Sequence, residues 1–400
     1  MSEWKKVKLG DVLEIKHGYA YSGDHIIEED NNIVLVTPGN FRIGGGFQEN
    51  KCKFYDGEIP QDYILKEADF IVTMTDLSKN IDTLGYSAYI PKSDKRLYLH
   101  NQRIGLVSFK NDKCDRGYIY WLMRTHSYQR AIANTSTGST VHHTSPTKIC
   151  DYECVVPEKS IQHRIATILS RYDSLIDNYQ KQIKLLEEAA QRLYKEWFVD
   201  LHFPGHENTK IVDGVPEGWE KKTLSDISSI IMGQSPKSEF YNTDGNGLPF
   251  HQGVGSYGYR FVVDNIYSTS FTRIAEPNSI LFSVRAPVGR LNITKNRIVI
   301  GRGLAAINHK MGCQSYLYYL LKEKFFKDNI IGNGAIFASI SKDELYNQVF
   351  VIPSDEMVMR YDAIANKIDQ NIQYVDSQIR LLTKARDRLL PKLMSGEIAV

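Results

Sequence analysis

The sequence lacks the features of a membrane or secreted protein. No apolar run reaches the roughly 18 residues of a membrane-spanning helix, and the first residues lack the apolar stretch of a signal peptide. The five cysteines are an odd number without a CxxC pair. This pattern argues against a disulfide framework and fits a reducing compartment. We therefore expect a cytoplasmic protein with no membrane partner.

Several catalytic motifs are also missing. The chain contains no Pro-Pro dipeptide, which an amino-methyltransferase would need in the loop that holds a flipped base. It has no Walker A lysine loop, and the glycine turn at residues 44–46 is not followed by a helical pattern. We therefore expect no catalytic residue and no cofactor in this chain.

Two short patterns could be taken for metal sites. Cys150 and Cys154 could share a strand face close to His142–His143, which would suit zinc, although free core thiols explain them as simply. The acidic residues within 217–220 could serve a metal-dependent nuclease, but the corresponding stretch at residues 4–6 has no carboxylate. Neither pattern is specific, and we expect no metal.

A long internal repeat is the most prominent feature that is present. Residues 155–198 recur as residues 351–394, 196 positions later and without a gap. The identical pairs are Val155/Val351, Pro157/Pro353, Arg164/Arg360, Ile168/Ile364, Asp173/Asp369, Ile176/Ile372, Gln182/Gln378, Ile183/Ile379, Leu185/Leu381, Leu186/Leu382, Ala189/Ala385, Arg192/Arg388 and Leu193/Leu389. Such a repeat predicts two structurally related halves.

Both copies of the repeat have the pattern of a long amphipathic helix. From Ile161 to Trp197 the apolar residues recur in steps of three and four, as in a coiled-coil seam. Some 40 residues at about 1.5 Å each would form a rod of about 60 Å. Two surface helices, each packed on its own domain, are the alternative to two rods packed on each other. The residues expected to form the seam of these spacer helices are Ile176, Ile183, Leu186, Leu193, Ile372, Ile379, Leu382 and Leu389.

The segments that precede the two helices repeat more weakly. Residues 4–18 align with residues 219–233, which pairs Trp4 with Trp219 and Gly18 with Gly233. Short strand patterns and glycine turns predict β-rich mixed domains. We therefore expect an α+β fold in which two such domains are separated by two long antiparallel coiled-coil helices with pseudo-two-fold symmetry. The expected boundaries are 1–156 for the first domain, 157–199 for the first helix, 200–217 for a linker, 218–352 for the second domain, and 353–400 for the second helix and tail.

Charge gives a modest indication of a nucleic-acid partner. The formal net charge is +2, but residues 218–353 carry 15 Lys and Arg against 10 Asp and Glu. A solvated face would look similar. Arginine and amide side chains read base edges, whereas Lys, Ser and Thr mainly hold phosphates. The candidates in the first domain are Lys79, Asn101, Gln102, Arg103, Thr140, His142, His143 and Lys148, and those in the second are Arg260, Arg285, Arg290, Arg302, Ser339, Ser341 and Lys342. For each, a solvated or salt-bridged side chain is the alternative.

Five stretches carry a resemblance to a known family. They are residues 155–166, 182–186, 193–200, 214–219 and 389–398. With them the chain resembles, over essentially its whole length, the specificity subunit of type I restriction-modification enzymes. One departure from an exact repeat is Arg386, which stands where the first copy has Ala190.

The resemblance implies a non-catalytic subunit that reads double-stranded DNA. Each domain would read one half of a split, asymmetric site, and the helices would set the gap and dock two copies of the methylation subunit. Those partners would carry S-adenosylmethionine and methylate adenine N6. Restriction subunits, with ATP and Mg²⁺, would join them.

A structural or adaptor protein is the alternative from a different class. In it, two β-rich domains on a coiled-coil strut would bind proteins or glycans, and composition does not exclude this. The two hypotheses differ in one property that is easily measured, because only a DNA-reading protein should bind DNA with an affinity that falls steeply as salt rises.

Overall fold

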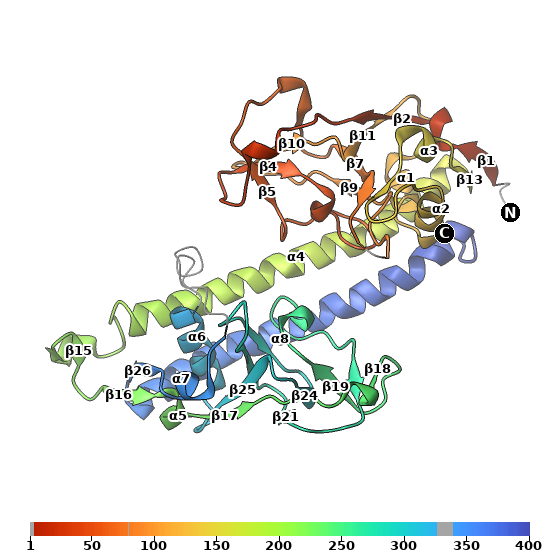
Figure 1. Ribbon diagram of the computed structural model, residues 1–400. Helices are drawn as coiled ribbons and strands as arrows, with labels where there is room; N and C mark the ends of the chain where they lie inside the picture. The colour runs from red at the N-terminus through yellow and green to blue at the C-terminus, as the bar shows by residue number, and fades with distance from the viewer. Residues whose placement is uncertain (1–3, 79, 326–338) are drawn as a thin grey trace. The chain divides into compact units, whose positions relative to one another are not determined.

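The computed structural model describes residues 4–78, 80–325 and 339–400 (Figure 1). The chain forms two compact units, and each is assembled on the same plan from a β-rich domain and parts of two long helices. Unit 1 comprises residues 1–178 and 379–400, and unit 2 comprises residues 179–378. The helices are α4 (Lys159–Phe198) and α8 (Asp355–Ser395), and each contributes to both units. The predicted α+β class with a duplicated domain is confirmed.

The domain of unit 1 contains two main sheets. In the first, the strand order is β3 (Ile26–Ile27), β5 (Lys53–Tyr55), β4 (Ile33–Val36), β10 (Leu97–His100) and β6 (Ile64–Leu65). In the second, it is β2 (Leu13–His17), β11 (Ile104–Phe109), β7 (Phe70–Thr73) and β9 (Ser87–Tyr89). Only β4 and β10 pair in parallel within these two sheets, as far as the described residues extend.

The described part of this domain also contains two small strand pairs and three α-helices. The pairs are β1 (Lys5–Lys8) with β13 (Glu153–Val156), and β8 (Thr75–Asp76) with β12 (His142–His143). The helices are α1 (Arg116–Leu122), α2 (His126–Asn134) and α3 (Pro146–Cys150).

The core of unit 1 joins the domain to the helices. All four residues of β7 are buried, because apolar side chains cover both of its faces. Trp121 is fully buried, and its indole nitrogen donates to the hydroxyl of Ser170 on α4 at 3.0 Å. Leu169 of α4 and Leu393 of α8 belong to the same cluster. Because residues of the domain, α4 and α8 share this cluster, they form one core. Burying each such side chain stabilises the folded state by about 1.5–3 kcal/mol.

The domain of unit 2 repeats this architecture. Its four-stranded sheet has the order β17 (Ser228–Met232), β25 (Leu304–His309), β22 (Ile280–Ser283) and β23 (Leu291–Ile293). Its five-stranded sheet has the order β18 (Tyr241–Asn242), β20 (Tyr267–Ser268), β19 (Leu248–His251), β24 (Ile298–Ile300) and β21 (Ile274–Ala275). The pair β19–β24 is parallel, as β4–β10 is in unit 1.

The remaining elements of unit 2 also have counterparts. Strand β16 (Glu220–Thr223) pairs with β26 (Val349–Ile352), as β1 pairs with β13. Helix α7 (Lys342–Tyr346) occupies the position of α3, and the unit also contains α5 (Leu224–Ile227) and α6 (Gln314–Phe325). The linker forms a small hairpin from β14 (Ile211–Val212) and β15 (Val215–Pro216).

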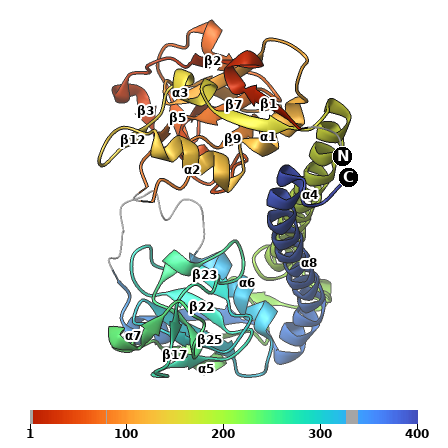
Figure 2. The same cartoon turned by 90° about the vertical axis from the view of Figure 1, so that its right-hand side faces the viewer.

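Helices α4 and α8 pack on each other within each unit (Figures 1 and 2). They run antiparallel, since Asp173 of α4 contacts Arg386 in unit 1, whereas Ala190 of α4 contacts Tyr361 in unit 2. Ile176, Ile183 and Ile372 are at most 4% exposed. The predicted seam is therefore an apolar interface inside the helix pair.

The asymmetry at Arg386 has a structural explanation. In unit 1 the Arg386 guanidinium donates to the Asp173 carboxylate at 2.6 Å. In unit 2 the equivalent position is Ala190, and the hydroxyl of Tyr361 donates to its carbonyl at 2.9 Å. A tyrosine hydroxyl thus makes in unit 2 a polar contact between the helices that an arginine makes in unit 1.

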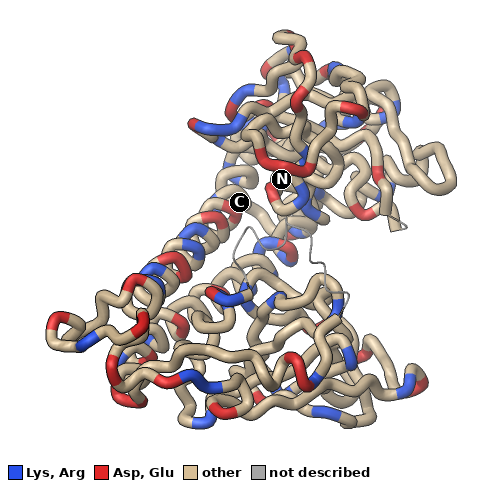
Figure 3. Tube along the Cα trace, turned by 60° about the vertical axis from the view of Figure 1, so that its left-hand side comes forward, with Lys and Arg blue, Asp and Glu red and all other residues tan. Residues whose placement is uncertain are grey.

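No helix among the described residues is long and apolar enough to cross a membrane. Acidic and basic residues are both distributed along α4 and α8, and Figure 3 shows where such residues lie along the chain.

Candidate nucleic-acid interface

Three segments of the unit 1 domain meet at one edge, which we call edge 1 and define as residues 74–76, 101–103 and 142–144. The amide of Met74 donates to the carbonyl of Arg103 at 2.9 Å, and the amide of Thr144 donates to the carbonyl of Met74 at 2.9 Å. Strand β12 then pairs with β8. Residues far apart in the sequence are therefore held side by side by backbone hydrogen bonds.

Edge 1 contains several of the predicted residues in different environments. Gln102 and Arg103 are exposed, and Thr140 is exposed beside the edge. Asn101 is only 7% exposed, and its side-chain oxygen accepts from the Arg103 amide at 3.0 Å. Asn101 therefore shapes the turn, and Gln102 and Arg103 present polar groups to solvent.

Among the remaining candidates of the first domain, the two histidines belong to edge 1. His142 is half-buried and pairs with Asp76 in the β8–β12 ladder. His143 is exposed, and its Nδ1 lies 3.1 Å from the hydroxyl of Thr75. The ammonium group of Lys148 donates to the carbonyl of Thr135 at the end of α2. Lys79 lies outside the described residues.

Asp76 is a residue of edge 1 that the sequence interpretation missed. It is 1% exposed, and its carboxylate accepts from the amides of Ser78 at 2.6 Å, Thr83 at 2.5 Å and Leu84 at 3.0 Å. Burial alone would raise the pKa of Asp76, but these hydrogen bonds outweigh it and hold the pKa below its ordinary value. Asp76 thus organises the loop that follows β8. An Asp two residues before a Ser is a turn signal that could have identified it.

The unit 2 domain forms an equivalent edge, edge 2, from residues 283–285, 301–303 and 339–341. The amide of Val284 donates to the carbonyl of Gly303 at 2.9 Å, and the amide of Ile340 donates to the carbonyl of Val284 at 2.9 Å. Arg285 also forms a β-bridge with Ser339. The three segments correspond one to one with those of edge 1.

Edge 2 brings together most of the candidates predicted in the second domain. Arg285, Arg302 and Ser339 are exposed. Arg290 is half-buried, and its backbone amide donates to the Ser283 hydroxyl at 2.8 Å. The edge therefore carries two exposed guanidinium groups.

Ser341 and Lys342 lie where edge 2 leads into α7. The Ser341 hydroxyl accepts from the Glu344 amide at 3.2 Å, and the Glu344 carboxylate accepts from the Ser341 amide at 2.7 Å. Ser341 is thus the helix cap of a capping box. Lys342 is exposed, with its ammonium group 5.1 Å from the ring centre of Tyr346.

Arg260 has a different environment from the one predicted. It is 2% exposed, and its guanidinium donates to Glu187 of α4 at 2.7 Å and to Asp369 of α8 at 2.6 Å. It also lies 3.7 Å from the ring centre of Tyr318. A side chain so enclosed is not available to a base edge. Arg260 instead fastens the domain of unit 2 to its helices, and this enclosure is incompatible with the DNA contact predicted from its sequence context.

Unit 1 contains the same arrangement, built around Arg124. This arginine is 5% exposed, donates to Asp173 at 2.5 Å, and lies 4.2 Å from the ring centre of Trp121. Asp173 and Asp369 are equivalent in the helix repeat, yet Arg124 follows α1 whereas Arg260 lies in a loop before β20. We call this feature, an aspartate of the repeat with a buried arginine over aromatic rings, the arginine socket.

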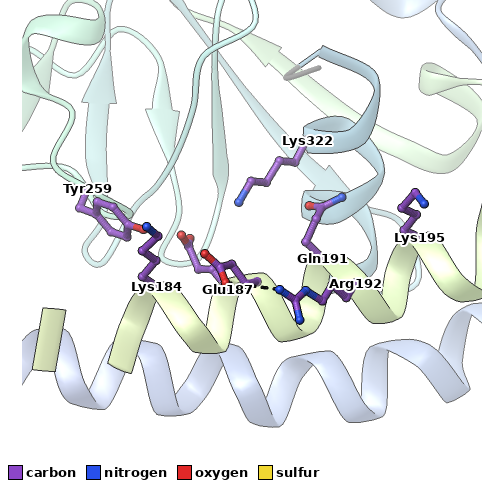
Figure 4. A pocket seen from close by; sticks show the side chains of 8 residues that line it. Lys184, Glu187, Gln191, Arg192, Lys195, Tyr259 and Lys322 are labelled. Atoms are coloured by element: carbon purple, nitrogen blue, oxygen red, sulfur yellow. Dashed lines mark ion pairs between the residues drawn. The ribbon is translucent and has the colours of Figure 1, made fainter. Parts of the chain in front are cut away.

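A cavity of about 290 Å³ lies in unit 2 between α4 and the domain (Figure 4). It is lined by Lys184, Glu187, Glu188, Gln191, Arg192, Lys195, Tyr259 and Lys322. The Glu187 carboxylate forms an ion pair with the Arg260 guanidinium at 2.7 Å, and the Glu188 carboxylate lies 3.8 Å from the Arg192 guanidinium. Its carboxylates are thus paired within the protein, and we assign no ligand to it.

The cysteine residues are free thiols. Burial raises the pKa of Cys154 to about 12, which opposes the thiolate form that binds zinc. No cluster of three or more potential metal ligands occurs in the part of the chain that the structure describes.

Two related domains with matching polar edges, each packed on segments of α4 and α8, define a duplicated protein with two units of the same plan. Comparison with known protein families identifies the family to which the chain belongs. The model of the type I restriction modification DNA specificity domain matches residues 1–188 and 216–389. The chain belongs to this family.

Individual relatives agree with the family assignment. The chain is 31% identical over 309 residues to a putative type I restriction enzyme specificity subunit, MjaX, of Methanocaldococcus jannaschii, covering 76% of this chain and 72% of that protein. It is 23% identical to the EcoBI specificity subunit of Escherichia coli, covering 99% of this chain and 86% of that protein. The crystal structure of a type I S subunit from M. genitalium shares the fold, with a TM-score of 0.57, 18% identity, and coverage of 98% of this chain and 96% of that one.

Proposed function

We propose that this chain is the DNA-reading subunit of a type I restriction-modification complex and that it recognises a bipartite, asymmetric site in double-stranded DNA. The domain at residues 1–156 reads one half through edge 1, and the domain at residues 218–352 reads the other through edge 2. The observation that carries the proposal is the correspondence of the two edges. Their backbones match, but Gln102 and Arg103 stand on one and Arg285 and Arg302 on the other. Different side chains on equivalent backbones favour two different half-sites.

The helices at residues 157–199 and 353–400 set the gap between the half-sites and dock two copies of the methylation subunit, and residues 200–217 link the halves. The seam residues predicted for docking are less suitable than their neighbours, because Ile183 and Ile372 are at most 3% exposed inside the helix pair. Leu185 and Leu381 are better suited, with 64% and 62% exposure at equivalent positions of the repeat. One exposed leucine in each copy fits two identical partners.

The chemistry belongs to the partner subunits in this proposal. The methylation subunits carry S-adenosylmethionine and methylate adenine N6, and restriction subunits use ATP and Mg²⁺. This chain contributes positioning and sequence discrimination only.

The test is a methylation map. The chain is co-expressed with its methylation subunit in a host without adenine methylation, and methylated adenines are read by single-molecule sequencing. We expect two short fixed blocks around a constant unspecified gap. A continuous palindrome would contradict the two-reader arrangement, and an assembled complex without any methylation would contradict the DNA-reading function.

A further inference from the structure

A glycine follows the first strand of the four-stranded sheet in both domains. Gly18 follows β2 and Gly233 follows β17, and the two align in the weak sequence repeat. A Cβ atom on Gly18 would lie 2.2 Å from the carbonyl oxygen of Asn101, and one on Gly233 would lie 2.1 Å from that of Gly301. No side chain fits at such a separation, so both positions require glycine.

The close approach fixes the position of the next residue in each domain. The amide of Tyr19 donates to the carbonyl of His100 at 2.8 Å, and the amide of Gln234 donates to that of Ile300 at 3.0 Å. His100 and Ile300 are the last residues of β10 and β24, the equivalent strands of the parallel pairs. Tyr19 and Gln234 therefore occupy the same backbone position in the two domains.

Both residues are adjacent to the edges. The carbonyl of Tyr19 accepts from the amide of Gln102 at 2.9 Å. In the other domain, the hydroxyl of Ser235, next to Gln234, accepts from the amide of Arg302 at 3.2 Å. The fixed position thus lies beside the exposed polar turn in each case.

The two side chains offer different chemistry at this position. The Tyr19 ring is 42% exposed and is supported by Tyr21 at 5.1 Å and Tyr63 at 5.3 Å between ring centres. It presents a rigid apolar surface. Gln234 is exposed, and its side-chain amide makes no hydrogen bond to any residue that the structure describes. It offers a donor and an acceptor together.

Each kind of side chain matches a known base contact. An apolar side chain contacts the methyl group of thymine in the major groove, whereas a glutamine amide pairs with N6 and N7 of adenine. We propose that Tyr19 and Gln234 are equivalent specificity-determining residues, Tyr19 contacting a thymine and Gln234 reading an adenine. This inference rests on the proposed function and adds which residues and bases are involved.

Methylation maps of the complete complex test the inference with Gln234→Ala, Gln234→Glu and Tyr19→Ala. Gln234→Ala should relax one adenine position in the half-site of the second domain, lowering its preference roughly ten-fold or more. Gln234→Glu, which accepts from the cytosine amino group, should shift that position toward cytosine. Tyr19→Ala should relax one thymine in the other half-site. The gap should be unchanged throughout.

Lys237→Ala is the matched control, because Lys237 is an exposed residue of the same loop, in a solvent-exposed ion pair with Glu239 at 3.8 Å. It should leave every position of the motif unchanged. Unaltered motifs in both Gln234 variants and in Tyr19→Ala would overturn the inference and leave the proposed function intact. A relaxed adenine at several positions, or loss of methylation everywhere in an assembled complex, would also overturn it. Absence of a bipartite motif in the unmodified complex would instead refute the proposed function.

Discussion

At the scale of single residues, the arginine socket makes the sharpest claim about stability. Arg260 is enclosed between two carboxylates of unit 2. We expect Arg260→Met to reduce the free energy of unfolding of this unit by about 3–5 kcal/mol, because Glu187 and Asp369 would be left as buried, unpaired charges. Urea denaturation followed by circular dichroism measures this change.

The control for Arg260→Met is Arg297→Met in the same domain. Arg297 and Glu276 form an ion pair at 3.1 Å in which both side chains are more than half exposed. Such a pair contributes less than about 1 kcal/mol. Equal losses in the two variants would show that burial of the socket does not matter.

The carboxylate of Asp76 predicts a pH dependence. Its folded pKa lies below its ordinary value of 3.8, so its hydrogen bonds stabilise the fold fully above that pH and are lost as pH falls through the folded pKa. Stability of the unmodified protein should therefore decline below about pH 4 more steeply than that of Asp76→Asn. Urea midpoints between pH 2.5 and pH 7 compare the two proteins, and parallel curves would contradict the assignment.

The exposure of the candidate residues follows from local sequence at the two turns but not at Arg260. Gln102, Arg103, Arg285 and Arg302 are exposed, as their polarity and flanking strands suggested. Arg260 looked the same in sequence but is enclosed by side chains from α4 and α8. Its counterpart, Arg124, comes from a segment that does not align with it. Enclosure depends on tertiary contacts, which local residue type does not encode.

At the scale of elements, α4 and α8 carry apolar residues of two kinds, those buried between the helices and those exposed on their outer surface. Ile183 is 3% exposed in the seam, while Leu185, two positions later, is 64% exposed. We expect the double change Leu185→Asp and Leu381→Asp to abolish docking of the methylation subunits while altering stability by under about 0.5 kcal/mol per site. Size-exclusion chromatography with light scattering measures the assembly, and thermal denaturation measures the stability.

The contrasting variant is Ile183→Asp with Ile379→Asp. It places charges in the helix interface, where they lack partners, so it should lower thermal stability strongly and prevent assembly as well. Normal assembly of the Leu185 and Leu381 variant would show that the methylation subunits dock on another surface.

The sequence located the long elements more reliably than the short ones. The first helix was expected at residues 157–199 and runs from Lys159 to Phe198, because three- and four-residue spacing extends over many turns. The apolar pattern of residues 118–133 predicts a single helix, but two are present, α1 and α2, separated at Thr125. The side chain of Thr125 accepts from the Tyr128 amide at 3.3 Å and starts a new helix. A single capping residue within an apolar segment is a weak sequence signal for the break between two helices.

At the scale of the whole molecule, the proposal that the two helices set the gap between the half-sites predicts how the DNA site changes with helix length. One heptad inserted in both helices, after Asn178 and after Gln378, would add about 10 Å while turning the seam by only about 20°. At about 3.4 Å per base pair, the gap should lengthen by about three base pairs. The methylation map measures the gap. In the control, the heptad sequence replaces seven existing residues of each helix, so the composition changes but the helix length does not. An unchanged gap would contradict the proposal that the helices set it.

The division of the helices between the units has a consequence for biosynthesis. Unit 2 is continuous from residue 179 to residue 378, whereas unit 1 needs residues 379–400, including the buried Leu393, to complete its core. About 200 residues separate these two parts of unit 1. A ribosome takes about 10–40 s to add them at about 5–20 residues per second. Of these two domains, the one translated earlier is therefore completed later, and its apolar face toward α8 stays uncovered throughout that interval.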